Sequence, residues 1–150
     1  MAKKHLARSV NLETGVSVLR ERFSGRLIPP LEGVAYRFTI WLPVQAQGRP
    51  VFSENQRMVL RDVLADCFGG FSESNFEGFP PWSGSWLPEG ADEPIVDFHI
   101  QMVIYALQDA EAVACVRHLK WLLQQDHVAA QEVVLIEQVP VQFVAAAEVI

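Results

Sequence analysis

The sequence predicts an α+β domain in which one antiparallel sheet is covered by two helices. Two segments, 34–44 and 96–104, alternate apolar and polar residues, as half-buried strands do. Two others, 53–68 and 109–126, repeat apolar residues every three or four positions, as amphipathic helices do. The chain of 150 residues is half hydrophobic and one-fifth charged, a composition typical of one domain with a full core.

The first 30 residues are predicted to form an N-terminal arm, with a disordered tip and then an element packed on the domain, and residues 31–150 are predicted to form that single domain. The arm has apolar residues without one clear period, and Pro29-Pro30 ends whatever structure it forms. Residues 1–26 carry six basic and two acidic side chains, so their net charge is +4, and the rest of the chain must carry −10 to reach the total of −6. An acidic body argues against nucleic acid as a partner.

The predicted strands at 34–44 and 95–107 each have one apolar and one polar side. The apolar sides, expected to face the helices, hold Val34, Tyr36, Phe38, Ile40 and Leu42 on the first strand and Val96, Phe98, Ile100, Met102 and Ile104 on the second. The polar sides hold Arg37, Thr39 and Trp41, and Asp97, His99 and Gln101. We therefore expect Phe98 and Ile100 to be nearly fully buried.

Both helices begin at residues that are typical N-caps. Ser53 and Gln56 have the spacing of a capping box, and Asp109 precedes the second helix. Gly69-Gly70 ends the first helix, because glycine adopts the left-handed cap without a steric cost.

Residues 71–94 are the least regular part of the chain. Pro80-Pro81 forbids a regular central strand, so we expect a broken edge strand over residues 71–87. Residues 132–144 predict a final strand rich in β-branched residues, with Pro140 confining it to an edge or a bulge.

The predicted element order is β-α-β-β-α-β, which is that of the ferredoxin-like fold. In that fold the strands at 34–44 and 95–107 are central neighbours, and both helices lie on one face of a four-stranded antiparallel sheet. The polar sides of these two strands would then meet on the open face of the sheet.

One pattern resembles that of a group of small uncharacterised bacterial proteins. In those proteins a helix ends in Phe-Gly-Gly, and a Gly-x-Trp follows shortly before a long strand. The matching positions here are Phe68, Gly69, Gly70, Gly84 and Trp86. The resemblance implies a ferredoxin-like fold and implies no activity.

Asp97 and His99 are the candidate catalytic pair. Two residues apart on a strand, they point the same way, and a nearby carboxylate raises the pKa of a histidine and orients its ring. Arg37 or Gln101 could then hold an anionic or carbonyl substrate. The alternatives are a solvated polar face and a face buried in a dimer with its polar groups paired.

The sequence predicts no metal site and no cofactor. The spacings of zinc proteins are absent, and Cys115 and His118 diverge on their helix rather than converging on one ion. Cys67 and Cys115 are expected to be buried, reduced thiols.

Exposed aromatic residues are the remaining candidates for binding. Trp82 and Trp86 could stack on a planar ligand, or they could cover one end of the core. Trp121 points away from the buried stripe of its helix, so we expect the N-terminal arm or another chain to cover it.

We expect the protein to act by assembly or binding through the open sheet face, as a homodimer. Trp41 and Tyr105 make this face more apolar than a solvated sheet needs. If His99 is ion-paired in the interface, association should weaken as pH rises through its raised pKa. The alternatives are a small dimeric barrel-type enzyme or small-molecule-binding protein that uses Asp97 and His99, and an acidic protein that neutralises a protein partner.

The compartment follows from two absences in the sequence. The basic start of the chain is not followed by the apolar stretch of a secretory signal, and no run without charged residues reaches the ~18 residues of a membrane span. We therefore expect a cytoplasmic protein that does not bind a membrane.

Overall fold

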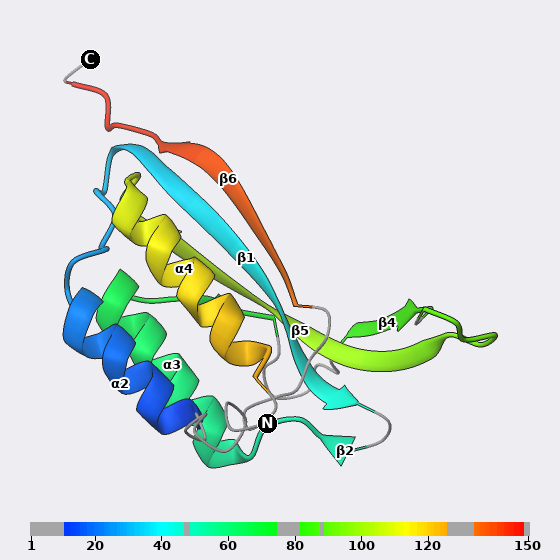
Figure 1. Cartoon of the computed structure of the whole chain (residues 1–150). Coiled ribbons are helices and arrows are strands. Elements are labelled where there is room, and N and C mark those ends of the chain that lie inside the picture. Colours follow the sequence, from blue (N-terminus) through cyan, green and yellow to red (C-terminus); the bar gives the residue numbers. More distant parts are fainter. Residues whose placement is uncertain (1–10, 47–48, 75–81, 88, 126–133, 149–150) are drawn as a thin grey trace.

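The computed structural model describes residues 11–46, 49–74, 82–87, 89–125 and 134–148. Within them the chain has an α+β fold, in which three helices lie on one face of an antiparallel sheet (Figure 1). The disordered tip expected at the start of the arm lies outside the described residues.

The sheet is built around two long central strands, β1 (Gly33–Ala46) and β5 (Ile95–Ala106), which pair along nearly their whole lengths. Strand β6 (Leu135–Phe143) pairs with the other side of β1, and the short β3 (Ser72–Glu73) and β4 (Trp82–Trp86) both pair with β5. The two-residue β2 (Arg49–Pro50) extends the end of β1. The broken edge strand predicted over residues 71–87 is therefore confirmed as β3 and β4.

The two predicted helices are α3 (Glu54–Phe68) and α4 (Ala110–Leu123), and their predicted caps are confirmed. The Ser53 side chain accepts a hydrogen bond from the Gln56 amide, and the Gln56 side chain accepts one from the Ser53 amide. Asp109 accepts from two amides of the first turn of α4, and Gly69 takes the left-handed conformation with φ of 84°.

A third helix, α2 (Leu12–Phe23), corrects the prediction of two helices. It lies in the segment expected to be an arm, and because it packs against both α3 and α4, the expectation that an element of the arm packs on the domain is confirmed. Its buried residues belong to the same core as the rest of the chain: Leu12, Gly15, Val16, Leu19 and Phe23. A Cβ at Gly15 would overlap the buried side chain of Leu122, so α2 approaches α4 closely at this point.

The basic residues of α2 are partly matched by the acidic residues of α3. Arg20 donates to the Asp66 carboxylate at 2.8 Å. Both side chains are about half exposed, so this pair adds little stability, but it fixes how α2 lies along α3.

The helix-facing sides of the central strands are largely as predicted. Phe38, Ile40 and Leu42 are buried on β1, as are Ile100, Met102 and Ile104 on β5. The prediction was wrong for Phe98, which is only half-buried, and for Val34, which is exposed. The first residues of β5 run with β4 beyond the described helices (Figure 1). Phe98 pairs with Gln45, next to a break in the register of β1 between Pro43 and Gln45, and it is incompletely buried there.

Candidate functional site on the open face of the sheet

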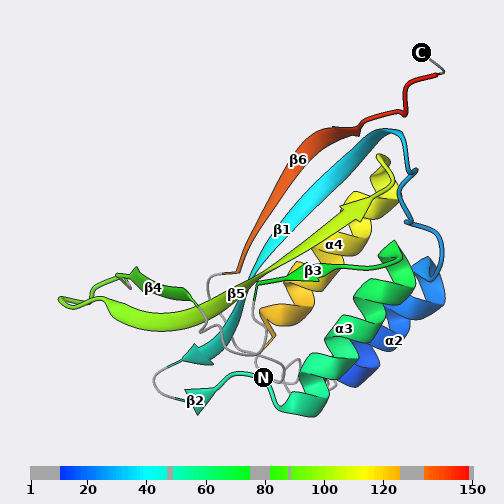
Figure 2. The same cartoon turned by 180° about the vertical axis from the view of Figure 1, so that it is seen from behind.

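The face of the sheet that carries no helix within the described residues is the candidate site (Figure 2). Because β1 pairs with β5 on one side and with β6 on the other, alternate residues of three strands form one surface. We call this surface the open face. Its main side chains are Arg37, Thr39, Trp41, His99, Gln101, Val103, Tyr105, Leu135, Glu137, Val139, Val141 and Phe143.

Trp41 joins two strands at one end of the open face. On β5 it is paired with Gln101, and His99 lies diagonally from it; on β6 it is paired with Leu135, and Glu137 lies diagonally. The indole N–H donates to the Glu137 carboxylate at 3.1 Å. The indole and the His99 imidazole meet edge to face, with ring centroids 5.2 Å apart and an interplanar angle of 65°. The sequence prediction that Arg37, Trp41, His99 and Gln101 share one face of two neighbouring strands is confirmed.

A second aromatic pair lies at the other end of the open face. Tyr105 on β5 and Phe143 on β6 have ring centroids 5.2 Å apart, although β1 runs between their strands. The residues of β1 at this end are Gly33 and the fully buried Ala35, which are small enough to let the rings meet. Sequence reasoning missed Phe143 as a member of this face, and the signal was the two-residue alternation of the final strand.

The pKa of His99 is lowered from its ordinary value by burial of the imidazole. The raised pKa was expected for a His99 that is ion-paired in a dimer interface, and that expectation stays a prediction. Burial among β-sheet side chains and the Trp41 ring disfavours the charged imidazolium. At neutral pH the imidazole is consequently neutral and can both donate and accept a hydrogen bond.

For three candidate residues the structure describes only the backbone, so their position relative to the open face is known from strand pairing alone. The backbone of Asp97 pairs with Gly84, that of Trp82 with His99, and that of Trp86 with Ile95. The side chains of Asp97, Trp82 and Trp86 lie outside the described part of the structure. The catalytic pair of Asp97 and His99 therefore stays a prediction.

Trp121 is not part of the open face. It lies on α4 with 46% of its surface exposed, and its ring tilts against that of His118 with centroids 5.5 Å apart. His118 lies on α4 as well, so this contact is within one helix. The expectation that the arm or another chain covers Trp121 stays a prediction.

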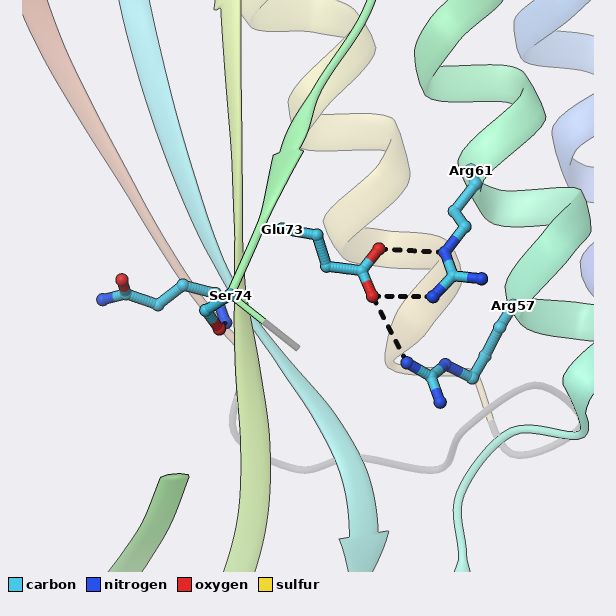
Figure 3. A network of polar contacts seen from close by, with 5 residues as sticks. Arg57, Arg61, Glu73 and Ser74 are labelled. Carbon is cyan, nitrogen blue, oxygen red and sulfur yellow. Dashed lines mark hydrogen bonds and ion pairs between the residues drawn. The ribbon is translucent and has the colours of Figure 1, made fainter. Parts of the chain in front are cut away.

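On the helix side of the sheet, an ion-pair network joins helix α3 to the short strand β3, which pairs with β5 (Figure 3). Arg61 of α3 donates twice to the Glu73 carboxylate, at 2.7 and 2.9 Å, and Arg57 donates to the same carboxylate at 3.3 Å. The Glu73 side chain is only 10% exposed, so it needs these donors to be stable as an anion. Glu73 also raises the pKa of Arg61, mainly through their hydrogen bonds.

Ser74 connects this network to the open face. The hydroxyl of Ser74 accepts from the Gln101 amide, and its own amide donates to the Gln101 carbonyl, both at 2.9 Å. Figure 3 shows Ser74 pointing away from Glu73, across the sheet. Ser74, the residue after β3, therefore holds the backbone of the candidate residue Gln101, and the preceding Glu73 side chain binds α3. Sequence reasoning missed this network, because nothing local links Arg57 and Arg61 to Glu73.

Cys67 and Cys115, far apart in the sequence, come together in the core. Both are buried and reduced, as the sequence predicted. The hydrogen bond between the two thiols lowers the pKa of Cys67, and the same bond together with burial raises the pKa of Cys115. Among the described residues no group of three or more His, Cys, Asp or Glu side chains is placed to hold a metal ion.

No protein-family model matches this chain, and no curated protein and no solved structure does so either. Among the described helices, none has the length and apolar character needed to cross a membrane.

Proposed function

We propose that the protein acts by self-association, with the open faces of two copies packed against each other in a homodimer. The observation that carries the proposal is the composition of this face. It presents Trp41, Tyr105 and Phe143 together with a row of aliphatic side chains, on the one side of the sheet that no described helix covers. Aromatic residues with polar partners are typical of interface cores, whereas a solvated sheet face is mainly polar.

The polar residues of the open face favour a second copy over an unrelated partner. Arg37 is a donor and Glu137 an acceptor, and both lie on the same surface. In a two-fold interface Arg37 of one copy can meet Glu137 of the other. The symmetry repeats this ion pair, so the interface contains it twice. The neutral imidazole of His99 also suits burial in such an interface, because burial of a charged imidazolium would cost free energy.

We further propose that the fold is ferredoxin-like. The adjacency of β6, β1 and β5, with β3 and β4 beyond, supports this proposal, as does the position of α3 and α4 on one face. Helix α2 is an addition to the simple β-α-β-β-α-β pattern. The likeness of Phe68, Gly69, Gly70, Gly84 and Trp86 to the pattern of small bacterial proteins points the same way.

The experiment is analytical ultracentrifugation at ~10 μM protein, well above the dissociation constant of a typical stable dimer. The wild type should sediment as a dimer, and both Trp41→Glu and Val103→Lys should be monomeric. The matched control is Trp121→Glu, which places the same charge on α4, on the other side of the molecule, and should remain dimeric.

Two outcomes contradict the proposal. A monomeric wild type would exclude the homodimer. A dimer that survives both substitutions on the open face would place the interface elsewhere and leave this face for the alternative, a small-molecule or catalytic site at Asp97 and His99.

A further inference from the structure

A hollow of about 290 Å³ lies on the helix side of the sheet, between α4 and the edge strand β6. Its floor is apolar and consists of Phe38, Val113, Val116 and Ile136. Phe38 and Val116 are buried members of the core, so the floor is rigid. The hollow is separate from the open face, because these residues lie on the opposite side of the sheet.

The rim of the hollow is polar and positively charged. Arg117 and Lys120 are three residues apart on α4 and therefore lie on the same side of the helix, and Gln138 faces them from β6. None of the described residues that line the hollow is acidic. Within the described part of the chain, neither Arg117 nor Lys120 forms an ion pair.

This local charge runs against that of the whole protein. The chain has a net charge of −6, yet among the described residues that line the hollow the only charged side chains are two cations, over an apolar floor. By contrast, Arg20 forms an ion pair with Asp66, and Arg61 forms one with Glu73. A surface cation over an apolar floor gains most when an anion with an apolar body fills the space between them.

We propose that this hollow binds a small amphipathic carboxylate, with an aryl or short alkyl body on the floor and the carboxylate between Arg117 and Lys120. The guanidinium offers two parallel donors that match a carboxylate, and the ammonium adds a second charge. Gln138 supplies a further donor from the opposite wall. The volume is at the lower end of that of small-molecule sites, which excludes a dinucleotide or a lipid with long chains.

The test is an NMR titration of the full-length, ¹⁵N-labelled protein with 3-phenylpropionate. Saturable shifts are expected at the amides of residues 113–120 and 136–138, which surround the hollow. The neutral 3-phenylpropionamide tests the need for the charge, and acetate tests the need for the apolar body. Both should bind at least about tenfold more weakly than 3-phenylpropionate, because each lacks one of the two interactions.

Two double variants complete the test. Arg117→Gln with Lys120→Gln removes the rim charges and should weaken binding of 3-phenylpropionate by about tenfold or more. Arg22→Gln with Arg26→Gln removes the same charge from the end of α2 and the loop after it, outside the lining of the hollow, and should leave binding unchanged. The proposal is overturned if the shifts map outside the hollow, if the amide binds as tightly as the acid, or if the two double variants weaken binding equally.

Discussion

The indole of Trp41 and the imidazole of His99 meet edge to face, with their ring centroids 5.2 Å apart across two neighbouring strands. Since the same indole donates to Glu137 on a third strand, a single side chain links β5, β1 and β6 on the open face. This relationship explains how a face that carries polar residues can still associate with a partner. The indole N–H is satisfied within the sheet, and much of the surface that this face offers to a partner is aromatic and aliphatic.

The lowered pKa of His99 predicts how stability depends on pH. The unfolded chain takes up a proton near pH 6.5, whereas the folded chain resists protonation until a lower pH. The free energy of unfolding contributed by His99 is therefore fully present above about pH 6.5 and falls as pH drops toward the folded pKa. Urea denaturation of wild type and His99→Gln at pH 7.5 and 5.5 should show the wild type losing more stability than the variant. An equal loss in both proteins would contradict the assignment.

The same linkage predicts the pH dependence of association. Because a dimer would bury His99 further, protonation should oppose it, so the dimer should weaken as pH falls. Sedimentation at pH 7.5 and 5.5 measures this directly. A dimer that weakens on raising the pH instead would require an ion-paired His99.

The carboxylate of Glu73 is predicted to matter for stability. Glu73→Gln removes the nearly buried carboxylate that accepts from Arg57 and Arg61 and should lower the free energy of unfolding by about 1–3 kcal/mol. The control is Asp66→Asn in the exposed pair with Arg20, where the loss should be about 0–1 kcal/mol. Urea denaturation measures both, and equal losses would mean that the Glu73 network is no more than a surface pair.

Gly15 is predicted to be the closest point between α2 and α4. Gly15→Val would drive methyl groups into the buried side chain of Leu122, so it should destabilise the protein by about 1–3 kcal/mol. Ser17→Val places the same residue on the exposed side of α2 and should change stability by less than about 0.5 kcal/mol. If Gly15→Val is neutral in thermal denaturation, α2 does not pack on α4 as described.

The two thiols are predicted to be inert in the native state. Both are almost completely buried, and their mutual hydrogen bond raises the pKa of Cys115. A disulfide-exchange reagent such as 5,5′-dithiobis(2-nitrobenzoate) should therefore react with them only after unfolding. Rapid reaction of either thiol in buffer would show that the core around α3 and α4 opens readily.

Local signals predicted the elements that follow simple periods. The alternation in β1 and β5, the capping box at Ser53 and the cap at Asp109 each depend on residues within a few positions of one another. Helix α2 has a regular stripe as well, at Leu12, Val16, Leu19 and Phe23. The exposed Val18 beside that stripe obscures its period, so the sequence predicts an element packed on the domain there but does not identify it as a helix.

Features that depend on distant parts of the chain could not be predicted in the same way. Phe98 continues the apolar alternation of β5, but its burial depends on where the helices end. The pairing of Glu73 with Arg61 and the meeting of Cys67 with Cys115 both follow from how α3 packs against the rest of the fold. The row of His99, Trp41 and Glu137 was partly predictable, because strand order sets which residues share a face.

The central claim is that two copies meet through the open face, and intermolecular contacts measured by NMR test it most directly. In a dimer mixed from ¹³C,¹⁵N-labelled and unlabelled chains, isotope-filtered nuclear Overhauser effects report only contacts between copies. We expect them between the side chains of Trp41, Val103, Tyr105 and Val139 and their counterparts. Intermolecular effects confined to α4 and Trp121, or none from the open face at a concentration at which the protein sediments as a dimer, would contradict the account.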